Sequence, residues 1–123
     1  MASPEELAWA GGLFEGEGSF VCYKLPNRRD SYRVVAVVPS TDKDVLDTFA
    51  LVIGFGKVKG PYKPSNGIKL RYTWEVQNFA ECLKAAELLY PYLHSRRREQ
   101  ADKLINLCKQ RMRTDGLITK NSQ

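Results

Sequence analysis

The chain has 123 residues, a formal net charge of +5 and a pI near 9.2, so it has room for one hydrophobic core and favours an anionic partner such as nucleic acid. Its three cysteines, Cys22, Cys82 and Cys108, and its one histidine share no metal-ligand spacing, which excludes a zinc site and predicts buried free thiols in a reducing compartment. No apolar run reaches about 18 residues and no signal peptide is recognisable, so we expect an intracellular, soluble protein without a membrane partner.

The first predicted element is a helix that begins with a capping box. Ser3 suits the N-cap, Pro4 suits the first helical position, and Glu6 completes the S-x-x-E pattern. The other end of this helix carries Glu15 and Glu17, although the helix dipole favours cations there. Segments that break a local rule in this way are expected at functional sites.

Small residues recur along one side of the same helix. Ala8, Gly12 and Gly16 are spaced by four and form a stripe that lets a second helix approach closely. If that helix is a symmetry copy, the carboxylates at the two helix ends repel unless a divalent cation such as Mg²⁺ lies between them. The alternative is an ordinary amphipathic helix with a glycine-rich end and solvated glutamates.

Two predicted hairpins follow, separated by a helix. Residues 20–25 and 32–38 read as paired strands, and residues 40–42 offer caps for a helix that ends at Gly54 and Gly56. Residues 57–62 and 68–76 read as a second hairpin around a turn at 63–67. Alternation in the last strand predicts one buried side, made of Ile68, Leu70, Tyr72, Trp74 and Val76.

The remainder reads as helical. Asn78 can cap a helix that Pro91 ends, and a last helix starts near Ser95 with three arginines. We expect one domain over residues 1–113 and a flexible tail over residues 114–123. The order α-β-β-α-β-β-α-α predicts an α+β fold with helices on one face of an antiparallel sheet and an open, mostly basic face suited to a DNA major groove. Trp9 and Trp74 are expected in the core.

Residues 10–20 (AGGLFEGEGSF) resemble the LAGLIDADG motif of homing endonucleases, with glutamate at both acidic positions. The element order, residues 53–57 (IGFGK) and residues 93–101 (LHSRRREQA) are also similar to that family, and the resemblance covers residues 5 to 110. It implies an αββαββα(α) LAGLIDADG endonuclease-like fold with a four-stranded antiparallel sheet. It further implies a homing-type endonuclease that hydrolyses phosphodiester bonds of double-stranded DNA with Mg²⁺ or Mn²⁺.

The resemblance also implies an assembly and a metal ligand. One motif per chain implies a homodimer that cuts a long, roughly palindromic site. In this arrangement Glu17 binds the metal, and Glu15 is a supporting acid at the dimer interface, together with Ala8, Gly12 and Gly16.

Two further positions are expected near the reaction. Gln77 stands where the family often has a basic side chain, near the end of the fourth strand, and Ser40 follows the second strand. Both could orient a water as catalytic residues, but neither supplies positive charge at the phosphate, which Arg71 could provide instead. The alternative function is therefore a non-catalytic DNA- or RNA-binding protein on the same scaffold, such as a maturase or a regulator. A protein-interaction module ranks third because of the basic charge.

DNA contacts follow from strand parity. If Ser19, Val21 and Tyr23 face the groove, Arg33, Val35 and Val37 do so as well. The valines could touch thymine methyl groups or mark a second buried surface. For the charged candidates the alternative is a solvated surface. The candidate DNA-binding residues are Tyr23, Arg28, Arg29, Arg33, Lys57, Lys59, Lys63, Lys69, Arg71, Arg96 and Arg97.

Overall fold

The computed structural model describes residues 2–26, 31–65 and 67–114. Their elements are α1 (Pro4–Glu17), β1 (Ser19–Lys24), β2 (Tyr32–Ser40), α2 (Lys43–Ile53), β3 (Lys57–Tyr62), β4 (Arg71–Val76), α3 (Phe79–Leu89), the 3₁₀ turn η1 (Tyr90–Tyr92) and α4 (Ser95–Thr114). The predictions for Arg28, Arg29 and residues 115–123 lie outside the described residues. In the described ranges, no helix combines the length and the apolar character needed to cross a membrane.

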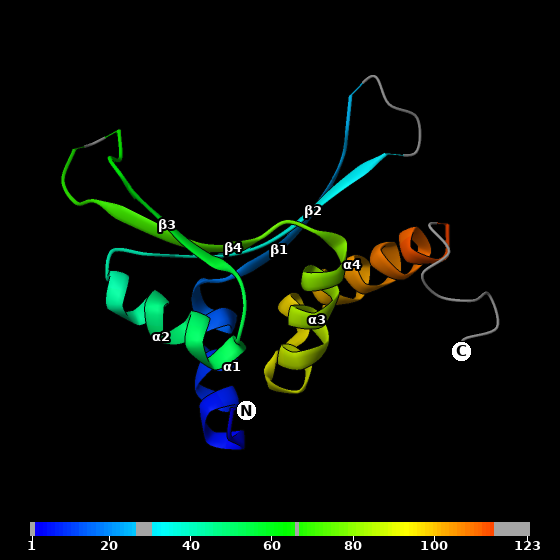
Figure 1. Ribbon diagram of the computed structural model, residues 1–123, viewed down its shortest axis with the longest axis horizontal. Helices are drawn as coiled ribbons and strands as arrows, with labels where there is room; N and C mark the ends of the chain where they lie inside the picture. The colour runs from blue at the N-terminus through cyan, green and yellow to red at the C-terminus, as the bar shows by residue number, and fades with distance from the viewer. Residues whose placement is uncertain (1, 27–30, 66, 115–123) are drawn as a thin grey trace.

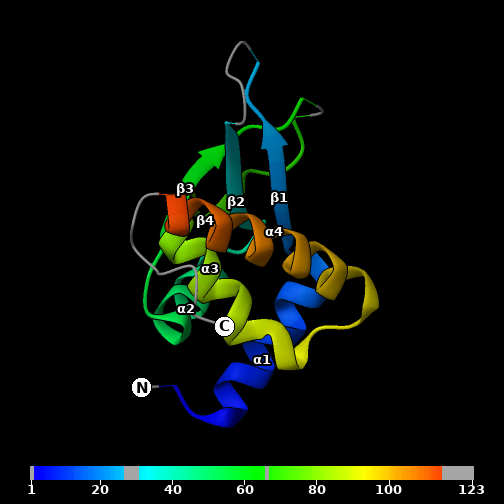
Figure 2. The ribbon, with the colours of Figure 1, turned by 90° about the vertical axis from the view of Figure 1, so that its right-hand side faces the viewer.

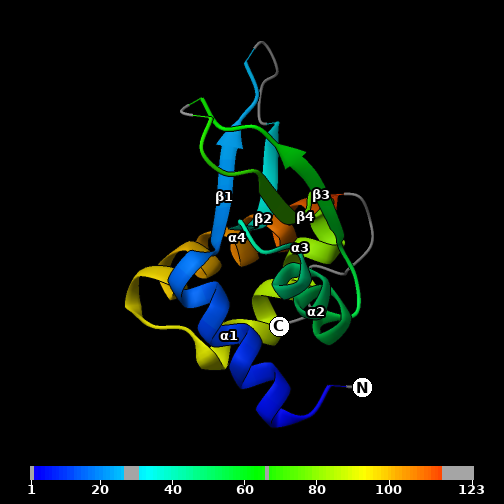
Figure 3. The ribbon, with the colours of Figure 1, turned by 90° about the vertical axis from the view of Figure 1, so that its left-hand side faces the viewer.

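The strands form one antiparallel sheet in the order β1-β2-β4-β3, which confirms the predicted α+β class. The helices gather on one face of the sheet, as the two side views also show (Figures 2 and 3). Both hairpins rise away from the helices at the two ends of the sheet, so the opposite face is open and curved (Figure 1). This face is the predicted binding surface.

Helix α1 begins at the predicted capping box, and packing of the Phe14 ring determines where it ends. The Ser3 amide donates to Glu6 Oε1 at 2.8 Å, and the Glu6 amide donates to Ser3 Oγ at 3.1 Å. At the other end, a Cβ on Gly18 would lie 2.6 Å from the Phe14 ring, so only glycine fits there. The Phe14 ring packs on Phe20 with centroids 4.4 Å apart, which fixes the turn from α1 into β1.

Strand parity follows the predicted pattern through β1, β2 and the end of β4. The core side chains of these strands are Phe20, Val34, Ala36, Val38, Trp74 and Val76. Ser19, Val21 and Tyr23 pair with Val37, Val35 and Arg33, so these six residues share the other face.

The prediction for residues 68–70 was wrong. Strand β4 begins at Arg71, and Ile68 and Leu70 are 77% and 48% exposed. A register shift between Lys59 and Tyr62 interrupts the β3–β4 ladder, whose last pair is Tyr62 with Arg71. The hairpin arm also extends beyond the helical layer, so no helix buries these side chains (Figure 1).

The two tryptophans have different environments. Trp74 is fully buried and donates from Nε1 to the Phe55 carbonyl at 3.0 Å. Gly56 has a φ of +91°, and a Cβ there would lie 2.3 Å from Trp74 Nε1, which explains the glycine. Trp9 is 41% exposed on α1, with its ring centroid 6.5 Å from that of Phe49, so the prediction of a core position for Trp9 was wrong.

The cysteines are free in the structure. Cys82 and Cys108 are buried, as predicted, whereas Cys22 is only half-buried. Burial raises the pKa of both Cys82 and Cys108 to about 12, so both remain protonated and unreactive at neutral pH.

Candidate active site and nucleic-acid interface

Of the two acids at the C-terminal end of α1, the second, Glu17, has an unpartnered side chain among the described residues. Glu17 is the last residue of α1 and is exposed, and in the part of the chain that the structure describes its side chain makes no hydrogen bond or ion pair. Ser19, two residues later, begins β1 on the open face of the sheet. Glu17 therefore lies where the helix meets the edge of the predicted binding surface.

The first acid has a structural contact instead. Glu15 Oε1 accepts a hydrogen bond from the His94 amide at 2.8 Å and joins α1 to the segment that leads into α4. This contact supports the predicted division of roles, in which Glu15 supports the site and Glu17 is the ligand.

The start of α4 is held at the junction of α1 and β1. Its first residues follow His94, which is bonded to Glu15, and Gln100 Oε1 accepts from the Phe20 amide at 3.1 Å. These two contacts lie on either side of Glu17 in the sequence. They hold the first two turns of α4 at the junction of α1 and β1.

Arg97 lies between these two contacts. It shares a helix face with Gln100, Ala101 and Leu104, by the spacing of three, four and seven residues. Its side chain is half-buried, and its Nε is buried without a hydrogen-bond partner among the described residues. For Arg97 we predicted only a DNA contact. The helical spacing was the signal that could have distinguished Arg97 from Arg96 and Arg98.

The neighbouring arginines differ from Arg97. Arg96 is exposed. Arg98 donates from Nη2 to the Pro91 carbonyl at 3.4 Å and stacks on the Tyr90 ring at 5.1 Å. The run of three arginines therefore contains one exposed cation, one locally bonded cation and one half-buried cation.

Gln77 and Ser40 are engaged with residues other than Glu17. Gln77 donates from Nε2 to Glu75 Oε1 at 2.9 Å. Ser40 has the parity of the buried residues of β2, and its hydroxyl accepts from the Asp42 amide at 3.0 Å in the turn before α2. A catalytic role for either residue stays a prediction.

One row of residues connects the Glu17 end of the sheet with its far edge. Ser19 pairs with Val37, Val37 pairs with Glu75, and Glu75 pairs with Lys57, so this row crosses all four strands on the open face. Val21 is exposed, and Val35 and Val37 are half-buried; no helix of the described ranges covers them (Figure 1).

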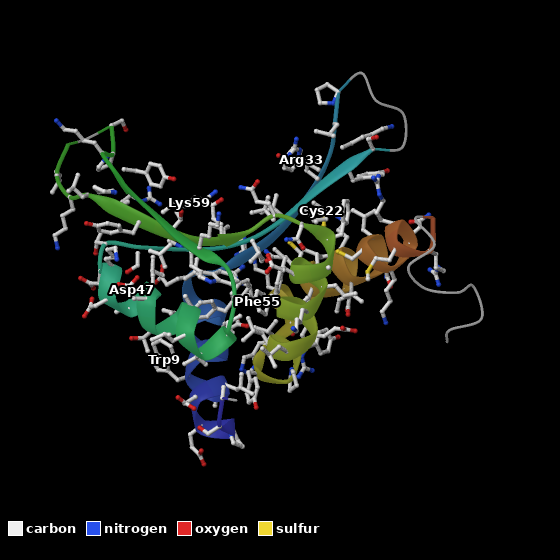
Figure 4. The ribbon with its side chains drawn as sticks, viewed as in Figure 1. Trp9, Cys22, Arg33, Asp47, Phe55 and Lys59 are labelled. Carbon is white, nitrogen blue, oxygen red and sulfur yellow. The ribbon has the colours of Figure 1, made fainter. Side chains whose placement is uncertain are left out.

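Cations flank this row on the open face. Arg33 and Lys59 lie on the side of the sheet away from the helices, whereas Asp47, Phe55 and Trp9 lie on the helical side (Figure 4). Lys59 is half-buried and forms an ion pair with Glu75 at 3.6 Å. The other predicted DNA contacts on the sheet and on the β3–β4 connection are exposed: Tyr23, Arg33, Lys57, Lys63, Lys69 and Arg71.

The small-residue stripe of α1 is exposed. Ala8, Gly12 and Gly16 face solvent, and a Cβ on Gly12 or Gly16 would have no other atom within 4 Å. Gly11 is different, since a Cβ there would lie 2.3 Å from Tyr92 Cβ. Packing within the chain therefore explains why residue 11 is a glycine. It does not explain the glycines at positions 12 and 16.

The metal-binding side chains of one chain suit a metal ion shared between two copies better than a metal ion enclosed within one copy. Within the described ranges, no group of three or more His, Cys, Asp or Glu side chains could hold a metal ion. One exposed carboxylate, Glu17, fits the way Mg²⁺ binds to one or two carboxylates with phosphate oxygens and water.

Comparisons with known proteins agree on the fold. No family model matches the chain, and no curated protein matches it in sequence. Solved structures of LAGLIDADG homing endonucleases do match. The homing endonuclease I-CvuI in complex with its target has a TM-score of 0.69 and 21% identity over 90% of this chain and 70% of that chain. I-TnaI has a TM-score of 0.67 and 18% identity over 96% of this chain and 80% of that chain.

A longer relative matches equally well. The LAGLIDADG homing endonuclease I-GzeII, in complex with its DNA target, has a TM-score of 0.73 and 20% identity over 98% of this chain. This chain spans only 40% of the length of I-GzeII, and 66% of I-CvuI in a second complex.

Proposed function

We propose that this chain, which has the fold of LAGLIDADG homing endonucleases, is a homodimeric, divalent-metal-dependent endonuclease that cuts double-stranded DNA at a specific site. The observation that carries the proposal is Glu17, an unpartnered carboxylate at the point where α1 meets the open basic face of the sheet. The solved relatives bound to DNA support the same reading.

The homodimer rests on two observations. The exposed stripe of Ala8, Gly12 and Gly16 offers a face for close contact with a second α1 helix. One copy spans 40% of I-GzeII, so two copies approach the length of that relative. A twofold axis along the stripe would bring the two Glu17 side chains together at one cleavage centre.

The residues of the chain would then have separate tasks. The two Glu17 carboxylates, with the scissile phosphates, would hold Mg²⁺ or Mn²⁺. When bound, such an ion polarises the phosphate and lowers the pKa of a bound water. The sheet would bind the major groove through Tyr23, Arg33, Lys57, Lys63, Lys69 and Arg71, and Arg96 would contact the backbone.

Arg97 would supply the positive charge that Gln77 lacks. Its half-buried guanidinium has a buried Nε without a partner among the described residues, and it lies between the two contacts that hold α4 at the junction of α1 and β1. A preorganised cation there would stabilise the charge that develops on the phosphate. This assignment favours the enzyme over the non-catalytic alternative.

The proposal is tested with a randomised duplex library. The wild-type protein is incubated with the library in Mg²⁺ and, separately, in EDTA, and the new DNA ends are sequenced. Ends that share a roughly palindromic site and require Mg²⁺ support the enzyme. Enrichment of bound sites without any Mg²⁺-dependent ends would instead establish the non-catalytic binding protein.

We predict that Arg97→Ala lowers the single-turnover cleavage rate by roughly 10²–10³-fold, because a preorganised charge at the phosphate is lost. Arg97→Lys restores part of the rate. Arg96→Ala is the control, since it removes an exposed cation from the same turn and should weaken binding without changing the rate at saturation. Equal rates for Arg97→Ala and the wild type at saturating protein would refute the assignment.

A further inference from the structure

A carboxylate is held at the centre of the otherwise basic face. Glu75 accepts a hydrogen bond from Thr73 Oγ1 at 2.8 Å and another from Gln77 Nε2 at 2.9 Å, and it pairs with Lys59 at 3.6 Å. We call Lys59, Thr73, Glu75 and Gln77 the Glu75 cluster. Thr73, Glu75 and Gln77 alternate along β4 and its end, so all three lie on the open face.

The charge of Glu75 is maintained by its neighbours. Its side chain is only 16% exposed, and this burial by itself raises its pKa. The hydrogen bonds from Thr73 and Gln77 and the charge of Lys59 act in the opposite direction, and they bring the pKa below its ordinary value. Glu75 is therefore a carboxylate at neutral pH and only accepts hydrogen bonds.

This chemistry fixes the orientation of Gln77. A carboxylate has no proton to donate, so Gln77 must direct its NH₂ group, and not its carbonyl oxygen, toward Glu75. The exposed carboxamide then presents its oxygen and its second N–H side by side. An adjacent acceptor and donor match the N6 amino group and N7 of adenine in the major groove.

The surroundings leave space for a base edge. Lys59, Glu75 and Gln77 of the Glu75 cluster line an open pocket of about 510 Å³ where β3 begins and β4 ends, and its lining also includes Phe55, Asn78 and Glu81. Glu81 is bonded to Asn78 through Asn78 Nδ2 at 2.8 Å and is not a partner of Gln77. Glu75 is thus the acid of this pocket that holds Gln77.

We propose that Glu75 is a positioning residue for base readout: it holds the Gln77 carboxamide in one orientation, so that the protein prefers adenine at one position of each half-site. This inference rests on the proposed DNA binding, and it assigns to Gln77 a role in sequence recognition in place of one in catalysis. It also explains why an acid is retained on a surface that binds phosphates.

The test measures base preference by selection from a randomised duplex library, with Ca²⁺ in place of Mg²⁺ so that binding is scored. The wild type is compared with Gln77→Ala, Glu75→Gln and Glu81→Gln. We expect Gln77→Ala to abolish the adenine preference at one position, a change of about tenfold or more. Glu75→Gln should reduce the preference at that same position, because a glutamine at 75 can donate as well as accept and lets Gln77 turn over.

The control separates positioning from charge. Glu81→Gln removes the same charge from the same pocket and should leave the base profile as in the wild type. Thr73→Val, which frees one oxygen of Glu75, should relax the same position less and keeps the test informative if Glu75→Gln does not fold. An unchanged profile in the folded variants, or a change spread evenly over all positions, would overturn the inference. If the wild type itself enriches no sequence, the proposed function fails instead.

Discussion

Glu17→Gln is expected to lower the rate of DNA cleavage by roughly 10²–10³-fold while DNA binding persists. Glutamine has the size of glutamate but lacks the charge that makes a carboxylate a good ligand for Mg²⁺. Because the proposed centre contains Glu17 from both copies, one substitution removes both carboxylates. Binding should be unchanged or tighter, since two negative charges leave the neighbourhood of the phosphates. Single-turnover cleavage and gel-shift titration on one selected site measure the two effects.

Glu5→Gln is the matched control for this experiment. Glu5 is an exposed acid in the first turn of the same helix, so its substitution removes the same charge far from the proposed centre. It should cleave at close to the wild-type rate. Cleavage by Glu17→Gln at the rate of this control would exclude Glu17 as the metal ligand.

Gly12→Leu is expected to dissociate the dimer without unfolding the chain. A Cβ on Gly12 has no other atom within 4 Å in a single chain, and replacing an exposed glycine inside a helix gains up to about 1 kcal/mol. Overpacking a close contact costs roughly 1–3 kcal/mol, and the twofold axis places the added side chain in the interface twice. The dimer dissociation constant should rise on the order of 30-fold or more. Sedimentation over a concentration series measures it, and cleavage should fall with the dimer.

Gly11→Ala serves as the comparison, because it should destabilise the folded chain and not the dimer contact. The added Cβ would lie 2.3 Å from Tyr92 Cβ, so this variant should lose thermal stability. Substitutions at two neighbouring glycines would then affect the folding of the chain and the assembly of the dimer separately. A Gly12→Leu protein that stays dimeric, or a wild type that is monomeric at micromolar concentration, would contradict the proposed seam.

The fold could be predicted largely because its signals are local. The capping box of Ser3 and Glu6 is a contact over three residues, and the left-handed Gly54 ends α2 next to the residues that it caps. Strand parity follows from the pleat alone, and it correctly put Arg33, Val35 and Val37 on the same face as their partners in β1. Alternation does not, however, show where a sheet extends past its helices, which is why Ile68 and Leu70 were misassigned.

The candidate site was predictable only in part. The sequence indicated Glu15 and Glu17 through their conflict with the helix dipole, but it could not rank the two by geometry. The structure distinguishes them, because Glu15 accepts from the His94 amide across 79 positions of the chain and Glu17 has no such contact. Gln77 was predicted to be a functional position, yet its link to Glu75 depends on side-chain directions that spacing does not specify.

The elements, their order, the open face of the sheet and the glycine stripe could all be predicted, since each depends on spacing along one helix or strand. Which residues meet depends instead on how distant segments pack. The contacts of Glu15 and Gln100 bring the start of α4 to the junction of α1 and β1, and there a buried nitrogen of Arg97 has no hydrogen-bond partner among the described residues. Packing also surrounds Glu75 with donors from β3 and β4. Such contacts join distant segments, and their geometry is set by the packing of the whole core.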